Sequence, residues 1–274
     1  MAENLVRPMI VRGIRPALAE SVGNLRDYDR WATLAWIDTS LRYRRTVLGP
    51  WWMTLSTGVI ITSVGILWGS IFGTDLSTYM PFFATGIILW TLIGETLREA
   101  CEVFTHADAL IKSVPTALMV YVHRMMARQV IIFGHNAILI VILWAIFPWP
   151  LGWTTLLAIP GLIITMLVLA GGTLLLAILC TRYRDIPQIV SALLQLLFLL
   201  TPIMWMPDSI RGKAASVLLD FNPFYYLIEI VRGPLLGRPP EGYVWIVACC
   251  FALLSLLAGH AIYGRFRHRV AYWL

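Results

Sequence analysis

The sequence predicts an all-α integral membrane protein with six transmembrane helices per subunit, and three observations lead to this fold class. Of the 274 residues, 59% are hydrophobic and only 13% are charged, whereas about a quarter of a typical soluble domain is charged. The mean hydropathy is +0.76. Several long stretches lack Asp, Glu, Lys and Arg, and they are long enough for helices of roughly 20 residues that cross about 30 Å of hydrocarbon.

Six spans follow from these charge-free stretches. The stretch 129–181 is long enough for two spans, and "FPWPLGW" at Phe147–Trp153 divides it because prolines and glycine break a helix there. The expected six-span domain covers residues 46–268. Its spans are predicted at about 51–72, 79–97, 127–147, 154–180, 186–206 and 243–264.

The distribution of Lys and Arg predicts the orientation, because cytoplasmic loops carry an excess of these residues. Residues 1–45 are rich in arginine, and more basic residues lie between spans two and three, between spans four and five, and after span six. The first two loops on the other side carry none. Both termini are therefore expected in the cytoplasm, with tails at 1–24 and 269–274. No signal peptide is visible in the first 45 residues.

Residues 25–45 are predicted to form an amphipathic helix at the inner membrane surface. A partial apolar stripe recurs along it at helical spacing, formed by Trp31, Leu34, Ile37 and Leu41. Such a helix can lie in the headgroup layer with its arginines toward anionic lipid. A solvated cytoplasmic helix is the alternative.

Two other segments are expected on the cytoplasmic side. Residues 96–115 predict a short, mostly polar helix that can dock on a soluble partner, and a plain connecting loop is the alternative. The turn "TRYRDIPQI" at Thr181–Ile189 has two arginines that fit a cytoplasmic anchor. In it, Asp185 followed by Ile186 and Pro187 is typical of a helix N-terminus.

The longest outer segment, 207–241, contains a clearly marked helix. In "FNPFYYLIEIVRGPLLG", Asn222 can cap the helix, Pro223 suits its first position and Gly233 can end it. Glu229 and Arg232 are spaced as an i, i+3 ion pair. The apolar face of this helix predicts a re-entrant element between spans five and six, paired with a second short piece near 214–219.

The sequence offers little that points to catalysis. It has no G-x-x-x-x-G-K-[ST] loop, and its one Gly-Lys pair, Gly212-Lys213, is followed by alanine. The four cysteines form no C-x-x-C pair, and the histidines match no metal-ligand spacing. We therefore expect no metal site and no enzymatic activity of this chain's own. If it transports a substrate uphill, another subunit supplies the energy.

Four stretches, placed in order along this topology, carry a resemblance to a known family. They are "LRYRRTVLGPWW" before span one, "ADALIKSVP" between spans two and three, "YRDIPQI" with "TPIMW" through span five, and "FNPFYYLIEIVRGPLLG" before span six. Together they resemble the membrane (permease) subunit of type 2 ABC exporters, in particular the polysaccharide and O-antigen export branch. The resemblance covers about residues 25–270.

The resemblance implies a homodimer of six-span subunits in a bacterial inner membrane, with two copies of an ABC ATPase subunit bound below. ATP and Mg²⁺ would be bound by the ATPase subunits, and this chain would hold no cofactor. The implied cargo is a lipid-linked, O-antigen-like polysaccharide that leaves the cytoplasm through a homodimeric channel. No nucleic-acid partner is expected.

The resemblance also implies three groups of site residues. The pyrophosphate of a polyprenyl-linked glycan would be met by Arg42, Tyr43, Arg44 and Arg45, beside the turn at Leu48 and Gly49. Guanidinium groups suit phosphate oxygens, although a simple positive-inside cluster is the alternative. A coupling helix and the adjoining turn would meet the ATPase through Asp108, Leu110, Ile111, Lys112, Arg182, Arg184 and Asp185. An outer gate would use Asn222, Pro223, Tyr225, Tyr226, Glu229 and Arg232.

A sugar channel is expected to be lined by aromatic rings, because sugar C–H faces stack on them. The candidates are Tyr79, Phe82, Phe83, Trp90 and Phe198, for which packing or lipid contact is the alternative. Other cargoes also stay open at this point, namely capsular polysaccharide, teichoic acid, a drug or a small lipid. A membrane enzyme acting on polyprenyl phosphates is a further alternative, but Asp27 and Asp29 are too sparse for its acidic motif.

Overall fold

The computed structural model describes residues 13–274 except 43, 45, 50, 115 and 208–216. These residues form helices joined by short loops, without a β-strand among them, which confirms the predicted all-α class. The helices are α1 (Ile14–Arg26), α2 (Tyr28–Arg42), α3 (Trp51–Phe72), α4 (Leu76–Ala100), α5 (Asp108–Ser113), α6 (Leu118–Ile146), η1 (Trp153–Leu157), α7 (Ala158–Arg182), α8 (Ile186–Leu200), α9 (Val217–Asp220), α10 (Pro223–Leu235), α11 (Gly242–Phe266), η4 (Arg267–Arg269) and α12 (Val270–Trp273).

Among the described residues, five helices are long and apolar enough to cross a membrane, namely α3, α4, α6, α7 and α11. The fifth predicted span, 186–206, is helical only over the 15 residues of α8. At 1.5 Å per residue, α8 is about 22 Å long, which is less than the roughly 30 Å of hydrocarbon in a bilayer. The helix stops because Thr201 is extended (φ −86°, ψ 136°), the backbone that a following proline favours.

The N-terminal region differs from the single helix expected at 25–45. Two helices, α1 and α2, meet at Asp27, whose backbone (φ −83°, ψ 44°) leaves the helical region. Helix α1 also begins at Ile14, inside the stretch 1–24 for which only a tail was expected. Charged residues flank Asp27, so the hydropathy of this region did not indicate α1.

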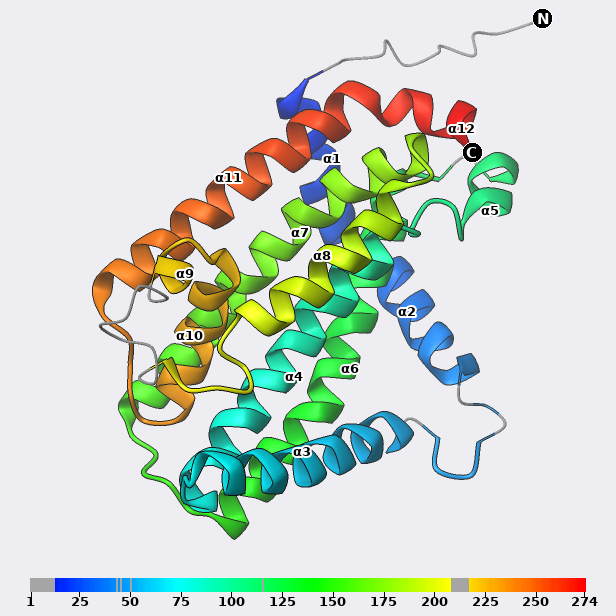
Figure 1. Ribbon diagram of the computed structural model, residues 1–274. Coiled ribbons are helices and arrows are strands. Elements are labelled where there is room, and N and C mark those ends of the chain that lie inside the picture. The colour runs from blue at the N-terminus through cyan, green and yellow to red at the C-terminus, as the bar shows by residue number, and fades with distance from the viewer. Residues whose placement is uncertain (1–12, 43, 45, 50, 115, 208–216) are drawn as a thin grey trace, which may run out of the picture.

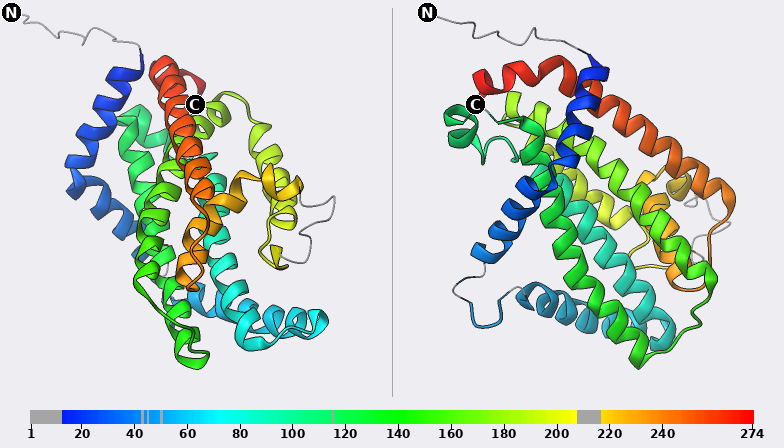
Figure 2. Two further views of the ribbon diagram at one scale, coloured as in Figure 1. Left: turned by 90° about the vertical axis from the view of Figure 1, so that its left-hand side faces the viewer. Right: turned by 180° about the vertical axis from the view of Figure 1, so that it is seen from behind.

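Helices α4, α6, α7, α8 and α11 run side by side, from the lower left to the upper right of Figure 1, whereas α3 lies across the lower ends of α4 and α6. Helices α1, α5 and α12 lie together at one end, here called the basic end because the arginines after α11 gather there. Helices α9 and α10 lie toward the opposite end (Figure 1, Figure 2). Helix α2 packs against α6 and runs across the direction of the long helices near the basic end (Figure 1).

Helices α7 and α11 approach each other so closely that their backbones touch, and glycines allow this approach. A Cβ on Gly171 would lie 2.3 Å from the backbone carbonyl carbon of Ser255, and one on Gly259 would lie 2.3 Å from the Gly171 oxygen. The Ser255 hydroxyl also donates a hydrogen bond to the Val168 carbonyl at 2.8 Å. Small residues of this kind bring transmembrane helix backbones into contact.

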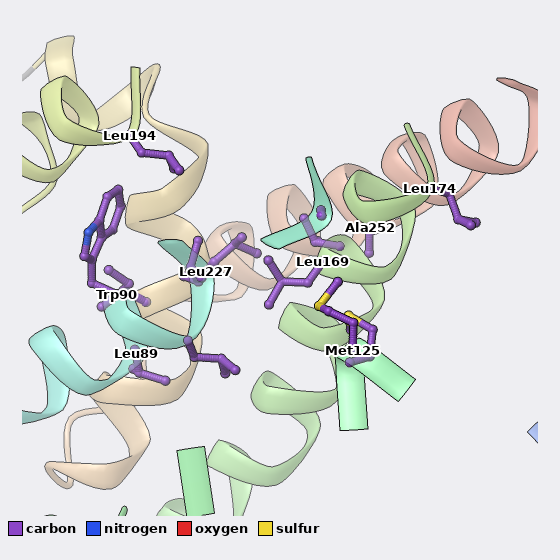
Figure 3. Close-up of a cluster of buried hydrophobic side chains, with 14 of the residues drawn as sticks. Leu89, Trp90, Met125, Leu169, Leu174, Leu194, Leu227 and Ala252 are labelled. Carbon is purple, nitrogen blue, oxygen red and sulfur yellow. The ribbon is translucent and has the colours of Figure 1, made fainter. Parts of the chain in front are cut away.

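The buried core lies around α7. In Figure 3, Leu169 of α7 lies between Ala252 of α11 and Leu227 of α10. Trp90 of α4 and Leu194 of α8 stand together at one edge of this cluster (Figure 3). The bundle core therefore joins α4, α7, α10 and α11, and α8 closes one side of it.

Replacement of Gly171 by alanine is expected to destabilise the protein by about 1–3 kcal/mol, because an inserted methyl group overpacks the helix contact. Thermal unfolding in detergent measures this as a lower melting temperature. Gly134→Ala in α6 is the matched control, since a Cβ there meets no atom within 4 Å. Equal melting temperatures for the two variants would show that the α7–α11 contact is not close-packed.

Candidate functional site

Helix α2 is held to the bundle by a network of ion pairs. Asp38 of α2 accepts hydrogen bonds from Arg124 Nε at 2.5 Å and from Arg128 at 3.3 Å, both on α6. Arg128 also donates to Glu99 of α4 at 2.5 Å, and Arg42 lies 3.6 Å from the other Glu99 oxygen. Two carboxylates thus join three arginines and three helices.

The network is largely shielded from solvent. The side chains of Asp38 and Arg128 are each 17% exposed and that of Glu99 is 22% exposed, while Arg42 is 48% exposed. Ion pairs strengthen as the surrounding dielectric falls, so the inner pairs fix α2 more firmly than the outer one does. Arg42 is the member that can change partner most easily.

Helix α2 packs against the protein through the side that carries Asp38 and leaves apolar side chains exposed on the other side. The side toward α6 carries Ala35, Asp38 and Thr39, spaced i, i+3, i+4. The opposite side exposes Trp36 (62%) and Leu41 (56%). Apolar side chains that point away from the protein suit a helix lying in lipid.

The predicted apolar stripe of α2 does not form one face. Ile37 and Leu41 are exposed, whereas Trp31 turns back to the protein, where its Nε1 donates to the Asn24 carbonyl at 2.9 Å and its ring lies 5.9 Å from that of His123. Trp31 is thus the member that departs from the stripe, and Asp38, which interrupts the stripe in sequence, anchors the helix to α6.

The residues expected to meet a pyrophosphate lie at the end of α2 and in the following turn. Arg44 is exposed, while Tyr43 and Arg45 are outside the described residues. Gly49 has φ +56°, a left-handed conformation that favours glycine. The Leu48 and Gly49 carbonyls accept the first backbone hydrogen bonds of α3, from Trp51 and Trp52.

An apolar groove begins at this turn. It has a volume of about 560 Å³ and runs between α3 and α6. Its lining residues are Leu48, Trp51, Thr54, Leu55, Gly58, Val59, Thr62, Ser63, Leu139 and Ile142. A groove of this composition fits a hydrocarbon chain better than a sugar.

A second groove of about 520 Å³ lies between α4 and α8 and combines rings with polar groups. The Trp90 and Phe198 rings stand 5.8 Å apart. The polar lining comes from Thr91, Glu95, Arg98, Ser191 and Gln195. Glu95 and Arg98 form an ion pair there. This mixture of ring faces and hydrogen-bonding groups suits a carbohydrate.

The other three aromatic candidates do not reach this groove. Tyr79 and Phe83 are 0% and 1% exposed, and their rings stack at 6.1 Å inside the bundle. Phe82 lies beneath the Arg232 guanidinium, 4.0 Å from its carbon to the ring centroid. The structure therefore brings Trp90 and Phe198 together and assigns the remaining rings to packing.

Helix α10 is locked to its surroundings by a buried arginine. Arg232 is 1% exposed, and it donates to Glu229 at 2.8 Å and to the Pro202 carbonyl at 2.7 Å. Asn222 caps the helix through the Phe224 N–H at 3.0 Å, and its amide donates to the Thr201 hydroxyl at 2.9 Å. The contacts of Arg232 with Pro202 and of Asn222 with Thr201 tie α10 to the segment that follows α8.

The remaining outer-gate candidates are also packed. Tyr225 and Tyr226 are 7% and 6% exposed, with ring centroids 5.4 Å apart in an edge-on arrangement. The Tyr226 hydroxyl donates to the Asp220 carbonyl at 3.0 Å. Pro223 occupies the first position of α10. The predicted gate residues thus extend along most of α10, from its N-cap Asn222 to Arg232 in its last turn.

The candidates for ATPase contact lie at the basic end. In α5, Lys112 pairs with Asp108 at 2.8 Å, Leu110 is exposed, and Ile111 packs against the core. The turn between α7 and α8 exposes Arg182, Arg184 and Asp185. α5 and this turn approach each other from different parts of the chain (Figure 1).

Helix α8 begins at Ile186 with a proline in its first turn, as the sequence predicts, but the side-chain cap that Asp185 could have supplied is absent. Asp185 occupies the N-cap position of α8, but its side chain makes no capping hydrogen bond. Its backbone is already helical (φ −91°, ψ −23°), whereas a capping side chain needs an extended N-cap backbone. Pro187 in the first turn also offers no N–H to cap.

Sequence reasoning missed several residues that the structure joins. Asp38, Glu99, Arg124 and Arg128 form the α2 network, yet the two α6 arginines read only as orientation signals. The signals that could have found them are Asp38, an acid within the predicted helix 25–45, and Glu99, an acid just after predicted span two. Trp273 lies against the Arg182 turn. Apart from its position after a basic run, nothing in the sequence indicated this contact. Among the described residues, no three His, Cys, Asp or Glu side chains gather as metal ligands would.

Taken together, apolar helices of membrane length, grooves along them and an exposed basic end define a multi-pass helical membrane protein. The ABC-2 type transporter family model matches residues 30–236. The chain therefore belongs to the ABC-2 type transporter family and is a transport component.

Two similar proteins are named as O-antigen export permeases. The O-antigen export system permease protein RfbA of Klebsiella pneumoniae is 22% identical over 85% of this chain and 90% of its own length. The protein of the same name from Myxococcus xanthus is 24% identical over 84% of this chain and 89% of its own length. The likeness thus runs through most of both chains.

Replacement of Asp38 by asparagine is expected to loosen α2, because two arginines on α6 lose their shared carboxylate. The free energy of unfolding should fall by about 2 kcal/mol, the typical worth of hydrogen bonds to charged groups. Hydrogen exchange of the α2 amides measures the loosening directly. Asp29→Asn on the exposed first turn of α2 is the control, and equal exchange in both variants would contradict the anchoring role.

Replacement of Glu229 by glutamine is expected to lower stability by about 1–3 kcal/mol, because the buried Arg232 keeps its charge but loses its carboxylate. The measurement is the melting temperature in detergent. Glu241→Gln is the control, since Glu241 is exposed and makes no capping hydrogen bond. An unchanged melting temperature in Glu229→Gln would mean that the ion pair does not hold α10.

Proposed function

We propose that this chain is the permease subunit of an ATP-driven exporter. It moves a lipid-linked, O-antigen-like polysaccharide from the cytoplasm across the bacterial inner membrane. The observation that carries this proposal is the likeness to two proteins named as O-antigen export permeases, which extends over 84–85% of the chain. The mixed aromatic and polar groove between α4 and α8 supports a sugar as the cargo.

In this proposal the chain adopts the six-span topology, with α8 and the segment after it as the fifth crossing. The basic end then faces the cytoplasm, in keeping with the excess of Lys and Arg expected there. Two copies of the chain form a homodimeric channel. Family membership implies an ATPase partner, and two such subunits would bind ATP and Mg²⁺ below the dimer.

The α4–α8 groove is the proposed sugar path. The Trp90 and Phe198 rings offer apolar faces to the C–H side of a sugar, as aromatic side chains commonly do for apolar surfaces. Ser191, Thr91 and Gln195 offer hydrogen-bond partners for sugar hydroxyls. Such a lining binds each sugar weakly and allows the chain to slide.

The end of α2 is the proposed loading region. Arg44 is exposed and Arg42 is half-exposed with only a 3.6 Å contact to Glu99, so both can turn to a pyrophosphate. Guanidinium groups bind phosphate oxygens through paired hydrogen bonds. The apolar α3–α6 groove starts beside them at Leu48 and offers a place for the polyprenyl chain.

The test is a double variant, Arg44→Ala with Arg45→Ala, in cells that lack their own permease and export through this chain. Surface glycan should fall about ten-fold or more, because a hydrogen bond to a charged group is worth roughly 1.5–3 kcal/mol. Recovery of the ATPase subunit with the purified chain should be unchanged.

The matched control is Arg15→Ala with Arg26→Ala, two exposed arginines of α1. Normal surface glycan in the Arg44, Arg45 variant would remove the pyrophosphate role. Failure of the unaltered chain to restore surface glycan, or to recover any ATPase subunit, would overturn the proposed function itself.

A further inference from the structure

The last helix of the chain folds back onto the basic end of the bundle. After α11, the short helices η4 and α12 turn the chain so that α12 contacts both α5 and α7. Figures 1 and 2 show α12 beside α5, beyond the ends of the long helices. No part of the ATPase-contact prediction included α12.

Trp273 is the centre of this contact. Its ring lies 5.4 Å from the Arg182 guanidinium carbon and 5.8 Å from the Phe266 ring. Its backbone carbonyl lies 3.5 Å from the Arg184 guanidinium, at the long limit of a hydrogen bond. A guanidinium over a Trp ring is an attractive cation–π contact. Trp273 therefore holds the α7–α8 turn against α12.

The surface around Trp273 exposes apolar groups at the basic end of the bundle. Tyr272 is 88% exposed, Val114 is 48% exposed, and Leu110 and Tyr183 are each 46% exposed. They come from α12, the end of α5 and the α7–α8 turn. In the proposed topology these segments lie on the cytoplasmic side, at the ends of the long helices (Figure 2), where lipid tails would not cover them. Grouped exposed apolar residues mark interaction surfaces.

The same surface is positively charged. Arg182, Arg184, Arg265 and Arg269 are exposed. Within the described part of the chain, none of these four arginines forms an ion pair with a carboxylate. Asp185 is the one exposed acid in the turn itself. A partner for this surface therefore needs acidic side chains around an apolar recess, because charge complementarity selects and orients protein partners.

We propose that α12 is a third element of the surface that binds the ABC ATPase subunit, next to α5 and the Arg182–Asp185 turn. Tyr272 inserts its ring into the ATPase subunit, and Trp273 fixes the turn against α12. This inference rests on the proposed function, which supplies the ATPase partner. Helix α12 would extend the docking surface with a segment that is far from the turn in sequence. Arg184 and Trp273 are 89 residues apart.

The experiment measures the dissociation constant of the purified chain for its cognate ABC ATPase subunit in lipid nanodiscs. Tyr272→Ala is the main variant, because an 88% exposed side chain can be removed without disturbing the fold. Binding should weaken about ten-fold, the effect expected of an aromatic residue at the centre of an interface. Trp273→Ala should weaken binding as well, and higher salt should weaken it further in every variant that retains the arginines.

Trp153→Ala is the matched control, since Trp153 is 89% exposed but lies in η1 at the opposite end. Leu110→Asp in α5 tests the docking surface independently of α12. If Leu110→Asp weakens binding while Tyr272→Ala and Trp273→Ala match Trp153→Ala, the role of α12 is overturned and the proposed function stands. If the unaltered chain binds no ATPase subunit, the proposed function fails, and the role of α12 fails with it.

Discussion

The backbone contact between α7 and α11 is the constraint on which the arrangement of the basic end depends. Gly171 and Gly259 let the two helices touch, and both helices then run toward the same end (Figure 1). The Arg182 turn follows α7 directly, and Trp273 follows α11 through η4. The two reach each other because their parent helices are packed together. One contact deep in the bundle therefore positions a surface at its end.

Ion pairs near the same end of the bundle attach α2, a helix that makes few contacts with the buried core. Helix α2 buries little apolar surface, and only Ala35 and Thr39 are fully buried along it. Its attachment comes instead from Asp38, which meets two arginines of α6. Protein contacts therefore hold one face of α2, and the opposite face leaves the apolar side chains of Trp36, Ile37 and Leu41 exposed. Movement of α2 would have to break ion pairs but would expose no core.

The sequence was sufficient for the features set by hydropathy and by local turn chemistry. The charge-free stretch 51–72 became α3, and Asn222 with Pro223 marked the start of α10. It was insufficient where residues far apart decide the structure. Arg232 was expected to pair with Glu229, but its contacts with Pro202 and Phe82 depend on tertiary folding. Tyr79 packs inside the bundle, whereas Trp90 lines the α4–α8 groove. Tertiary packing alone decides this difference, and no local sequence pattern predicts it.

The break after α8 shows how such packing permits irregular backbone beside apolar helices. In hydrocarbon, backbone outside a helix is tolerated only where the protein satisfies its polar groups. Here Arg232 donates to the Pro202 carbonyl, and the Tyr79 hydroxyl donates to the Met204 carbonyl at 2.5 Å. Two residues that looked like gate or channel candidates are thus committed to the chain that follows α8. A pathway past this segment would need α8 and α10 to move as one unit, because Arg232 and Asn222 tie both to it.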